Sequence, residues 1–401
     1  PLRRQRQMCI RDRDNAATTS TAPEVVSAML PFFTEYYGNP SSVYNFAQKS
    51  KMAIEDAREI IADSIGAAKS NEIYFTGGGS ESDNWALKSA AFGLRDKGNH
   101  IITTKIEHHA ILNTCAYLEK NGFEVTYLDV DSEGFVSLED VENAITEKTI
   151  LISVMFANNE IGTIEPVCEI GEIAHKHGIL FHTDAVQAMC HVPINVTEMN
   201  IDLLSASAHK FHGPKGVGFM YMKNSAKLEP FIHGGAQERA RRAGTSNVPG
   251  IVGMGQAVKL ALSTLDKDTH TIINMRNYIV DRILGEIPDV TFDGPCIDAN
   301  AVSAGSPAGS LKRLPSNMHF CFKDVSGDSL LIMLDMNGIC ASSGSACAAG
   351  SIDPSHVLLA IGRSKGETKG ALRLSIDKDL TKEDADYAID ALKAAVARLR
   401  R

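Results

Sequence analysis

The stretch that decides the fold is residues 150–184, ILISVMFANNEIGTIEPVCEIGEIAHKHGILFHTD. Two short apolar runs, 150–157 and 179–184, flank an amphipathic segment at 167–178 that ends in a glycine. Runs this apolar are typical of parallel strands buried on both faces, and parallel strands need a long crossover, usually a helix. The sequence therefore predicts a strand–helix–strand unit here.

The same alternation extends outward from this unit over about residues 70–225. More β-rich runs are predicted at 71–75, 100–104, 123–128, 202–208 and 216–222. Amphipathic helices are predicted among them at 80–94, 109–122 and 137–145. Strands alternating with helices predict an α/β fold with a mostly parallel central sheet and helices on both faces.

A second region follows a long helix predicted at about 249–286. It contains β-rich runs and helices that predict a smaller α+β domain: 317–322, 326–338, 370–376 and a last helix opening with the capping box TKED, 381–384. Because 401 residues are too many for one compact core, we predict a large domain at 14–262 and a small domain at 263–401.

Two segments are set apart from these domains. Residues 1–13, PLRRQRQMCIRDR, are basic and resemble a translated sequencing adapter, so we expect them to be non-native and exclude them from the fold. Residues 295–316 are rich in Ala, Ser, Gly and Pro and predict a surface loop.

The composition narrows the class of protein. The net charge is −9, whereas a general nucleic-acid binder would be basic, so we expect no nucleic-acid partner. We find no apolar run long enough to span a bilayer and no signal-peptide pattern, so we expect no membrane association. The eight cysteines lie far apart without a CxxC pair. This predicts reduced thiols and a cytoplasmic protein.

Ligands of an open parallel sheet bind beyond the carboxyl ends of its strands, and polar residues follow these strands. After the first strand, TGGGSESDN (76–84) offers Gly79 and Ser80 as phosphate contacts at a helix start, with a plain glycine turn as the alternative. EHH offers His108 or His109, and NNE offers Asn158 or Asn159. Structural histidines and turn asparagines are the simpler alternatives at those two places.

Two later motifs are more informative. In HTDAVQ, Asp184 ends an apolar strand, where a carboxylate needs a cationic partner, and the Gln187 amide follows. In SASAHKFHGPKG, Ser207 and His209 precede Lys210, a lysine that can become a nucleophile beside a buried site. A phosphate loop, a stacking His, an Asp for the pyridinium nitrogen and a Lys for the Schiff base are what pyridoxal 5′-phosphate (PLP) requires.

With these motifs in this order, the sequence resembles the cysteine desulfurases (NifS/IscS-like), which are fold-type I PLP enzymes of the class V aminotransferase family. The resemblance covers residues 14–400. It rests on DNAATT, GNPSS, FTGGGSESDN, EHHAILNTC, NNEIG, HTDAVQ, SAHKFHGPKG, RRAGT, SSGSAC and LRLS.

The resemblance implies a role for each matching residue. Lys210, Cys347 and His108 would be catalytic. The PLP-binding residues would be Gly79, Ser80, His108, Asn159, Asp184, Gln187, Ser207, His209, Lys210 and Thr245. Asn159 and Arg373 would bind the substrate, and a guanidinium fork suits its carboxylate. Thr245 would reach the phosphate bound by another subunit, which implies a homodimer.

The resemblance also implies an activity. Sulfur would leave L-cysteine as a persulfide on Cys347, with L-alanine as the other product. A sulfur-acceptor protein of iron–sulfur cluster or thio-cofactor biosynthesis would then receive it. Cys347 lies among small residues, ASSGSACAAGS (341–351), which predicts a loop free to carry sulfur outward, ended by a capped helix start at DPSHVL (353–358).

Other activities are compatible with the same motifs. A selenocysteine lyase or another class V PLP aminotransferase would share most of the site. A non-catalytic sulfur carrier or metal-binding protein could use Cys340, Cys347 and histidines, but this spacing matches no usual zinc motif, so we expect no metal. The remaining cysteines, as small apolar side chains, are predicted to be buried: Cys115, Cys168, Cys190, Cys296, Cys321 and Cys340.

Overall fold

The structure is a computed structural model that describes residues 11–12, 14–226, 228–297, 311–343 and 354–401. Cys347 and most of the loop predicted at 295–316 lie outside the described residues.

The central sheet has seven strands in the order β2-β8-β7-β6-β5-β3-β4. The five from β7 to β4 run parallel, and β8 is antiparallel to both of its neighbours, β2 and β7. This confirms the predicted mostly parallel sheet. The strand bounds are β2 (Ile73–Thr76), β3 (His100–Thr104), β4 (Glu124–Leu128), β5 (Thr149–Ser153), β6 (Leu180–Asp184), β7 (Leu203–Ser207) and β8 (Gly218–Met222).

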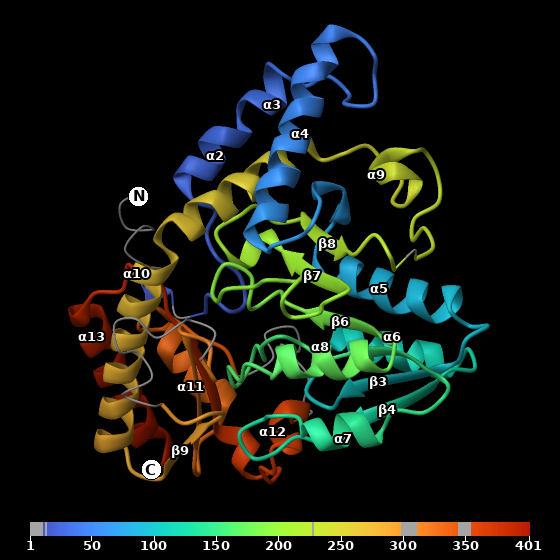
Figure 1. The fold of residues 1–401 in the computed structure, drawn as a ribbon. Coiled ribbons are helices and arrows are strands. Elements are labelled where there is room, and N and C mark those ends of the chain that lie inside the picture. The colour runs from blue at the N-terminus through green and yellow to red at the C-terminus, as the bar shows by residue number, and fades with distance from the viewer. Residues whose placement is uncertain (1–10, 13, 227, 298–310, 344–353) are drawn as a thin grey trace.

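Successive residues of these strands point to opposite faces, and each face has its own helices. Ile102, Ile152 and Leu204 join the larger apolar cluster, with α4 (Asn45–Ser64), α8 (Val167–Lys176) and the first part of α10 (Val248–Glu286). Their neighbours along each strand face α5 (Gly79–Gly93) and α6 (His109–Glu119). The sheet therefore lies between two helical layers, with α7 (Leu138–Asn143) beside α8 (Figure 1).

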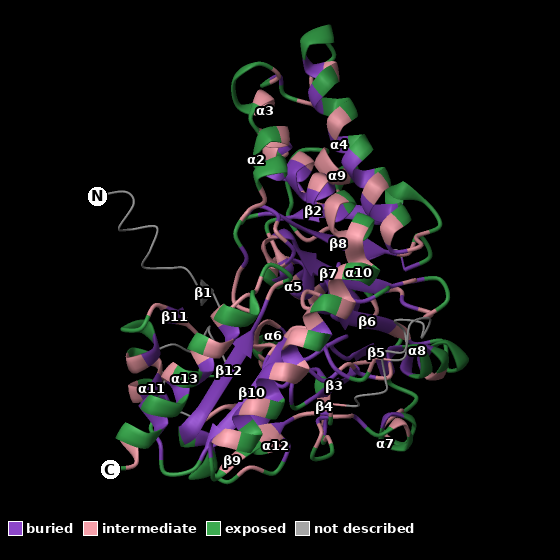
Figure 2. Cartoon of the chain, turned by 90° about the vertical axis from the view of Figure 1, so that its left-hand side faces the viewer, coloured by how far each residue is buried: buried purple, intermediate pink, exposed green. Residues whose placement is uncertain are grey.

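The smaller region contains a three-stranded antiparallel sheet, β12-β10-β9, packed against helices. Strands β10 and β12 are buried along their whole length, whereas edge strand β9 is partly exposed (Figure 2). Its elements are β9 (Val290–Asp293), β10 (Asn317–Phe322), α11 (Gly327–Asp335), β11 (Ile339–Cys340), α12 (His356–Ala360), β12 (Ala371–Ser375) and α13 (Lys382–Leu399). Thr381 caps α13, because its hydroxyl accepts the backbone N–H of Asp384 at 3.1 Å and lies 2.8 Å from the Asp384 carboxylate.

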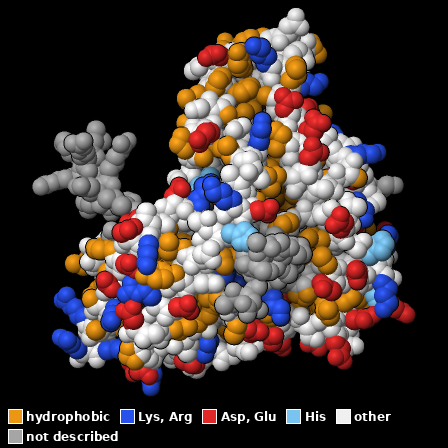
Figure 3. Space-filling model, turned by 60° about the vertical axis from the view of Figure 1, so that its left-hand side comes forward, with side chains coloured by type: hydrophobic (Ala, Val, Ile, Leu, Met, Phe, Trp, Pro, Cys, Tyr) orange, Lys and Arg blue, Asp and Glu red, His pale blue; other side chains and the backbone are white. Residues whose placement is uncertain are grey.

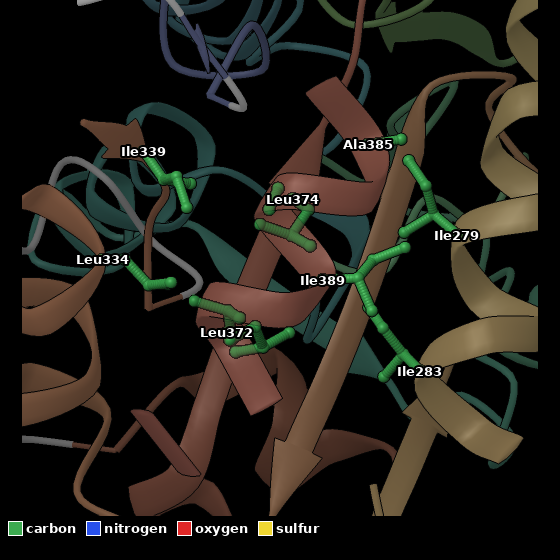
Figure 4. Close-up of a pocket in the computed structure, with 10 residues that line it drawn as sticks. Ile279, Ile283, Leu334, Ile339, Leu372, Leu374, Ala385 and Ile389 are labelled. Atoms are coloured by element: carbon green, nitrogen blue, oxygen red, sulfur yellow. The ribbon is translucent and has the colours of Figure 1, made fainter. Parts of the chain in front are cut away.

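A small apolar cavity lies inside this region, among α10, α13 and β12 (Figure 4). Its volume is about 20 Å³, and its walls are aliphatic, including Ile283, Leu372 and Ile389. A space this small, without a polar group, is a packing defect of the core and not a ligand site.

Helix α10 joins the two regions without a break. Ile251 and Met254 pack in the larger apolar cluster, whereas Ile279 and Ile283 pack in the apolar cluster of the smaller region. By length and composition this helix could cross a membrane, with 44% of its most apolar window buried. Its contacts with α4 and α2 (Pro23–Met29) are those of a core helix. The predicted domain boundary at 262/263 falls within it.

The N-terminal segment lies against the small domain. Strand β1 (Arg11–Asp12) pairs in parallel with β11, and the backbone of Asp14 forms an isolated parallel β-bridge with Ser375. The chain then crosses to the large domain, where Thr19 N–H donates to the carbonyl of His209. That residues 1–13 are non-native stays a prediction.

The prediction that six cysteines are buried is only half right. Cys115, Cys190 and Cys321 are buried, but Cys168 and Cys296 are exposed and Cys340 is half-buried. Cys168 lies on amphipathic helix α8, and the orientation of that helix turns its side chain away from the sheet.

Candidate active site

One cavity of about 190 Å³ at the carboxyl ends of the parallel strands gathers nearly all the predicted site residues. Described residues from both domains line it, and ten of them were predicted from the sequence: Gly79, Ser80, His108, Asn159, Asp184, Gln187, Ser207, His209, Lys210 and Arg373. This is the edge at which ligands of open parallel sheets bind.

One end of the cavity is suited to an anion. Helix α5 begins at Gly79, and its first N–H groups have no partner within the helix, so they face the cavity with the positive end of the helix dipole. The cap residue, Gly78, has φ +150°, which side-chain-bearing residues rarely adopt. A Cβ on Gly79 would lie 2.6 Å from Cγ2 of Val186, so glycine fits this packing.

Ser207 and His209 complete this end from the segment after β7. The Nδ1 atom of His209 shares a 3.1 Å hydrogen bond with the Thr18 hydroxyl. Burial, with smaller contributions from Lys210 and Lys215, lowers the pKa of His209 to about 4. At neutral pH this imidazole is therefore uncharged and acts through hydrogen bonds.

The other end of the cavity holds Asp184 and His108. Asp184 is buried, and its Oδ1 accepts the backbone N–H of Val186 at 2.9 Å. Burial raises the pKa of Asp184, while His108 and Lys210 act in the opposite direction. A buried carboxylate at this position is stabilised by a cationic ligand group.

His108 is the N-cap of α6, and its Nδ1 accepts the Ala110 N–H at 3.1 Å. This bond places the proton of the neutral ring on Nε2 and fixes the ring beside the cavity. His109 instead packs against His356, with ring centroids 4.8 Å apart. Of the two histidines considered, His108 is the one at the site.

The two asparagines separate in the same way. Asn159 lines the cavity, whereas Asn158 is fully buried and its Oδ1 accepts the N–H groups of Glu160 and Ile161. Asn158 therefore has the turn-forming role that was the simpler alternative for this motif.

Lys210 projects from the short turn after β7 toward the N-terminal segment. Its Nζ donates to the carbonyls of Ala16 and Ala17 at 2.5 and 2.8 Å. The Gln187 amide donates to the same Ala16 carbonyl at 3.0 Å. The DNAATT motif therefore forms one wall of the cavity.

Arg373, on β12, reaches the cavity from the small domain and is 1% exposed. Its Nη1 donates to the Asn159 carbonyl at 2.9 Å, and its Nη2 donates to Oδ1 of Asp14 at 2.8 Å. The other Asp14 oxygen accepts the Ser342 hydroxyl at 2.8 Å. Asp14 therefore orients the guanidinium and tethers the residue that leads toward Cys347.

Segment 344–353 carries Cys347, and the described residues on either side of it contact Arg373 and Glu107, the residue before His108. Ser342 exchanges backbone hydrogen bonds with Arg373, at 3.2 and 2.6 Å. On the other side, Ser355 caps α12 as predicted, and Nε2 of His356 bonds the Glu107 carbonyl at 2.9 Å.

Thr245 is the one predicted cofactor contact in the described chain that lies elsewhere. It lines a separate cavity with Thr76, Gly216, Glu238 and Arg242. Its predicted contact with another subunit's phosphate stays a prediction.

Sequence reasoning missed two carboxylates, Asp83 on α5 and Asp14. Asp83 lines the cavity and is 1% exposed. A signal was available, because Ser82, Asp83, Ala86, Leu87 and Ala90 recur at helical spacing and place the aspartate on the buried face. No local signal marks Asp14, whose partner Arg373 comes from the far end of the chain.

Comparison with known proteins places this site in a family. A family model for class V aminotransferases matches residues 13–388, so the chain belongs to that family. It is 54% identical to the cysteine desulfurase IscS of Clostridium botulinum strain Hall, over 96% of this chain and 94% of that protein. It is 52% identical to the IscS of Methanosarcina thermophila, over 96% and 92%.

Solved structures agree with the fold. A NifS-like protein superposes with a TM-score of 0.88 at 36% identity, covering 97% of this chain and 99% of the other. The structure of SspA in complex with cysteine superposes with a TM-score of 0.78 at 38% identity, covering 92% and 99%. The fold is that of the NifS-like enzymes, as the resemblance implied.

Proposed function

We propose that this chain is a PLP-dependent cysteine desulfurase, which converts L-cysteine to L-alanine and leaves the sulfur as a persulfide on Cys347. The observation that carries this is one cavity with an anion-binding helix terminus, Asp184, Lys210 and Arg373 in its walls. The cysteine desulfurases that match over nearly the whole chain, and the relative solved with cysteine, support the substrate.

The described residues fit PLP at both ends. The bare N-terminus of α5, with Ser80, Ser207 and His209, would hold the phosphate. At the other end, Asp184 would pair with the pyridine nitrogen, and Gln187 would bond the ring hydroxyl. His108 would lie on the ring, and Lys210 would hold the cofactor covalently. Bound PLP supplies an electron sink for the pair left on the substrate Cα.

The chain's own residues then orient the substrate and move its proton. Arg373 would bind the substrate carboxylate with the N–H groups that Asp14 and Asn159 leave available. Lys210, once its amine is released, would take the Cα proton on Nζ. Its contacts with the Ala16 and Ala17 carbonyls keep that amine at the cavity wall.

Cys347 would act as the sulfur nucleophile. Its thiolate attacks the substrate sulfur, an S–S bond forms, and the C–S bond breaks. The carbon keeps the bonding pair and takes a proton, which gives L-alanine. Cys347 is four residues from Ser343, so the chain between them allows their Cα atoms to lie up to about 14 Å apart. The anchoring of Ser342 beside Arg373 supports this reach.

The experiment is a comparison of Cys347→Ser with wild type. The variant should bind PLP and perturb its absorption on addition of L-cysteine, yet release no sulfide with a thiol reductant present. Cys168→Ser, which removes an exposed thiol of α8, is the matched control and should keep full activity. Sulfide release by Cys347→Ser at the wild-type rate would contradict the assignment of the nucleophile.

Two related activities can be distinguished from cysteine desulfuration by the substrates on which the enzyme acts. A selenocysteine lyase would release selenium from selenocysteine faster than sulfur from cysteine. An aminotransferase would convert a keto acid to an amino acid and would not need Cys347. Rates on cysteine, selenocysteine and a cysteine–keto acid pair therefore decide among the three.

We also propose a homodimer. The projecting part formed by α2, α3 (Pro31–Thr34) and α4 carries apolar side chains that a monomer leaves in water (Figure 3). They are 42–94% exposed and comprise Val26, Leu30, Phe33, Tyr37, Val43, Tyr44, Phe46 and Met52. A surface of this kind is typical of a subunit interface. Sedimentation at micromolar concentration should give twice the monomer mass.

The sulfur acceptor would be an iron–sulfur scaffold or a thiolation enzyme, and the compartment would be the cytoplasm. Five cysteines among the described residues are free thiols, as is typical of a reducing compartment: Cys115, Cys168, Cys190, Cys296 and Cys321. Transfer of labelled sulfur from Cys347 to a co-purified protein would identify the acceptor.

A further inference from the structure

A buried polar network lies on the α5 side of the central sheet, directly under the active site. The Ser153 hydroxyl bonds Nδ1 of His182 at 2.9 Å, and Nε2 of His182 bonds the Ser205 hydroxyl at 3.0 Å. Asp83 of α5 adjoins this network, with its Oδ1 3.8 Å from Nε2 of His182. All four side chains are at most 1% exposed. Asp83 is the end of this network that lines the cavity.

Asp83 has a hydrogen-bonding capacity that this network does not use. Its Oδ1 is buried and has no hydrogen-bond partner, and the nearest basic atom is Nε2 of His182, 3.8 Å away. Burial lowers the pKa of His182 to about 3, so this imidazole is neutral. Among the described residues, no lysine or arginine forms an ion pair with Asp83. A carboxylate here would be an uncompensated buried charge.

On its cavity side, Asp83 meets Asp184. The nearest polar atoms of Asp83, His108 and Asp184 all lie within 4.8 Å of one another. The titratable groups around Asp83 are Asp184 and His182 from β6, Glu107 and His108 before α6, and Lys210 after β7. Two buried carboxyl groups this close do not both ionise readily, and the charge of Asp184 raises the pKa of Asp83.

We propose that Asp83 is a positioning residue, which acts as a neutral carboxylic acid and donates a hydrogen bond to Asp184. Asp184 then carries the one negative charge that faces the pyridine nitrogen, and its position relative to the ring is fixed from below. The proposal rests on the proposed function, because it concerns how this chain prepares Asp184 for PLP.

The proton belongs on Asp83 for two structural reasons. Asp184 already accepts the Val186 N–H and lies beside Lys210 and His108, all of which favour its ionised form. For Asp83, burial and then the charge of Asp184 raise the pKa well above the usual value, and only the Ser205 hydroxyl acts in the opposite direction. An asparagine could copy the acid at this position, because its amide also donates a hydrogen bond and carries no charge.

The first test uses Asp83→Asn and Asp83→Leu, each prepared without cofactor and titrated with PLP. Asp83→Asn should keep the PLP affinity within about threefold and leave the pH dependence of the bound cofactor's absorption unchanged. Asp83→Leu removes the donor to a buried anion and should weaken PLP binding about tenfold or more. A shift of about one pH unit in Asp83→Asn would mean that an ionised Asp83 had been removed, and would overturn the proposal.

The second test detects the proton directly by infrared difference spectroscopy. Wild type should show the carbonyl band of a protonated carboxyl group that moves on PLP binding and is absent from Asp83→Asn. Glu165→Gln is the matched control, because Glu165 is a buried carboxyl outside the cavity whose pKa burial raises to about 8. It should lose a band that PLP does not move, and should bind PLP as wild type does.

The outcomes distinguish a failure of the proposed function from a failure of the role of Asp83 alone. If wild type takes up no PLP, the cofactor assignment fails, and the role of Asp83 fails with it. If wild type binds PLP but Asp83→Asn loses no PLP-sensitive band, the role of Asp83 alone is refuted. Equal loss of PLP affinity in Asp83→Asn and Asp83→Leu would also refute it, since a merely structural aspartate would tolerate neither change.

Discussion

Replacing Arg373 with lysine should selectively weaken binding of amino acids through their carboxylate. In the structure, one N–H of Nη1 is taken by the Asn159 carbonyl and one of Nη2 by Asp14. Each terminal nitrogen of the guanidinium keeps one more N–H, and together these form a fork for a carboxylate. The Nε atom is buried and forms no hydrogen bond among the described residues.

The expected loss of affinity follows from counting the N–H donors that each side chain offers to the carboxylate. A lysine ammonium has three N–H groups, and if Asp14 and Asn159 occupy two, one is left where arginine offers two. The loss of one hydrogen bond to a charged group costs about 1.5–3 kcal/mol, which is about 10- to 150-fold in affinity. Arg373→Lys keeps the positive charge, so Asp14 still has a cationic partner.

The assay is a titration of the PLP-loaded protein with L-alanine, the product, and with ethylamine, which lacks the carboxylate, followed by cofactor absorption. Arg373→Lys should weaken binding of L-alanine by the stated factor and leave ethylamine nearly unchanged. Arg276→Lys changes a buried arginine of α10 outside the site and should affect neither. An equal loss for both ligands would refute the assignment of Arg373 to the carboxylate.

Three more predictions address the cofactor and the fold. Lys210→Ala should lose the visible absorption of covalently held PLP, and an unchanged spectrum would contradict its role. Burial raises the pKa of Glu165 from 4.5 to about 8. The protonated side chain therefore contributes fully to stability below about pH 4.5, and this contribution is lost as the pH rises through 8. The free energy of unfolding of Glu165→Gln, measured with denaturant, should lack this pH dependence. Asp293→Ala leaves His319 and Arg363 without their shared carboxylate and should cost about 3–5 kcal/mol by urea unfolding, unlike the milder Asp293→Asn.

Much of the site could be predicted because it follows the order of the strands. Asp184 is the last residue of β6 and Lys210 lies three residues after the end of β7, and neighbouring parallel strands end at the same edge of a sheet. Residues that follow such strands are therefore brought together by the sheet alone. Cys168 does not follow a strand, but helical spacing gives its position: Val167, Ile170 and Ala174 mark the buried face of α8, and Cys168 lies off that face.

The sequence by itself determined the α/β class, the residues at the strand ends and the family. Only the tertiary structure decided which other side chains contact those residues and orient them. Asp83 approaches Asp184 from a helix on the other side of a packed interface, and Asp14 meets Arg373 from the opposite end of the chain. Neither pair has a characteristic spacing, because their distance is set by how helix, sheet and small domain pack and not by the local periodicity of the chain.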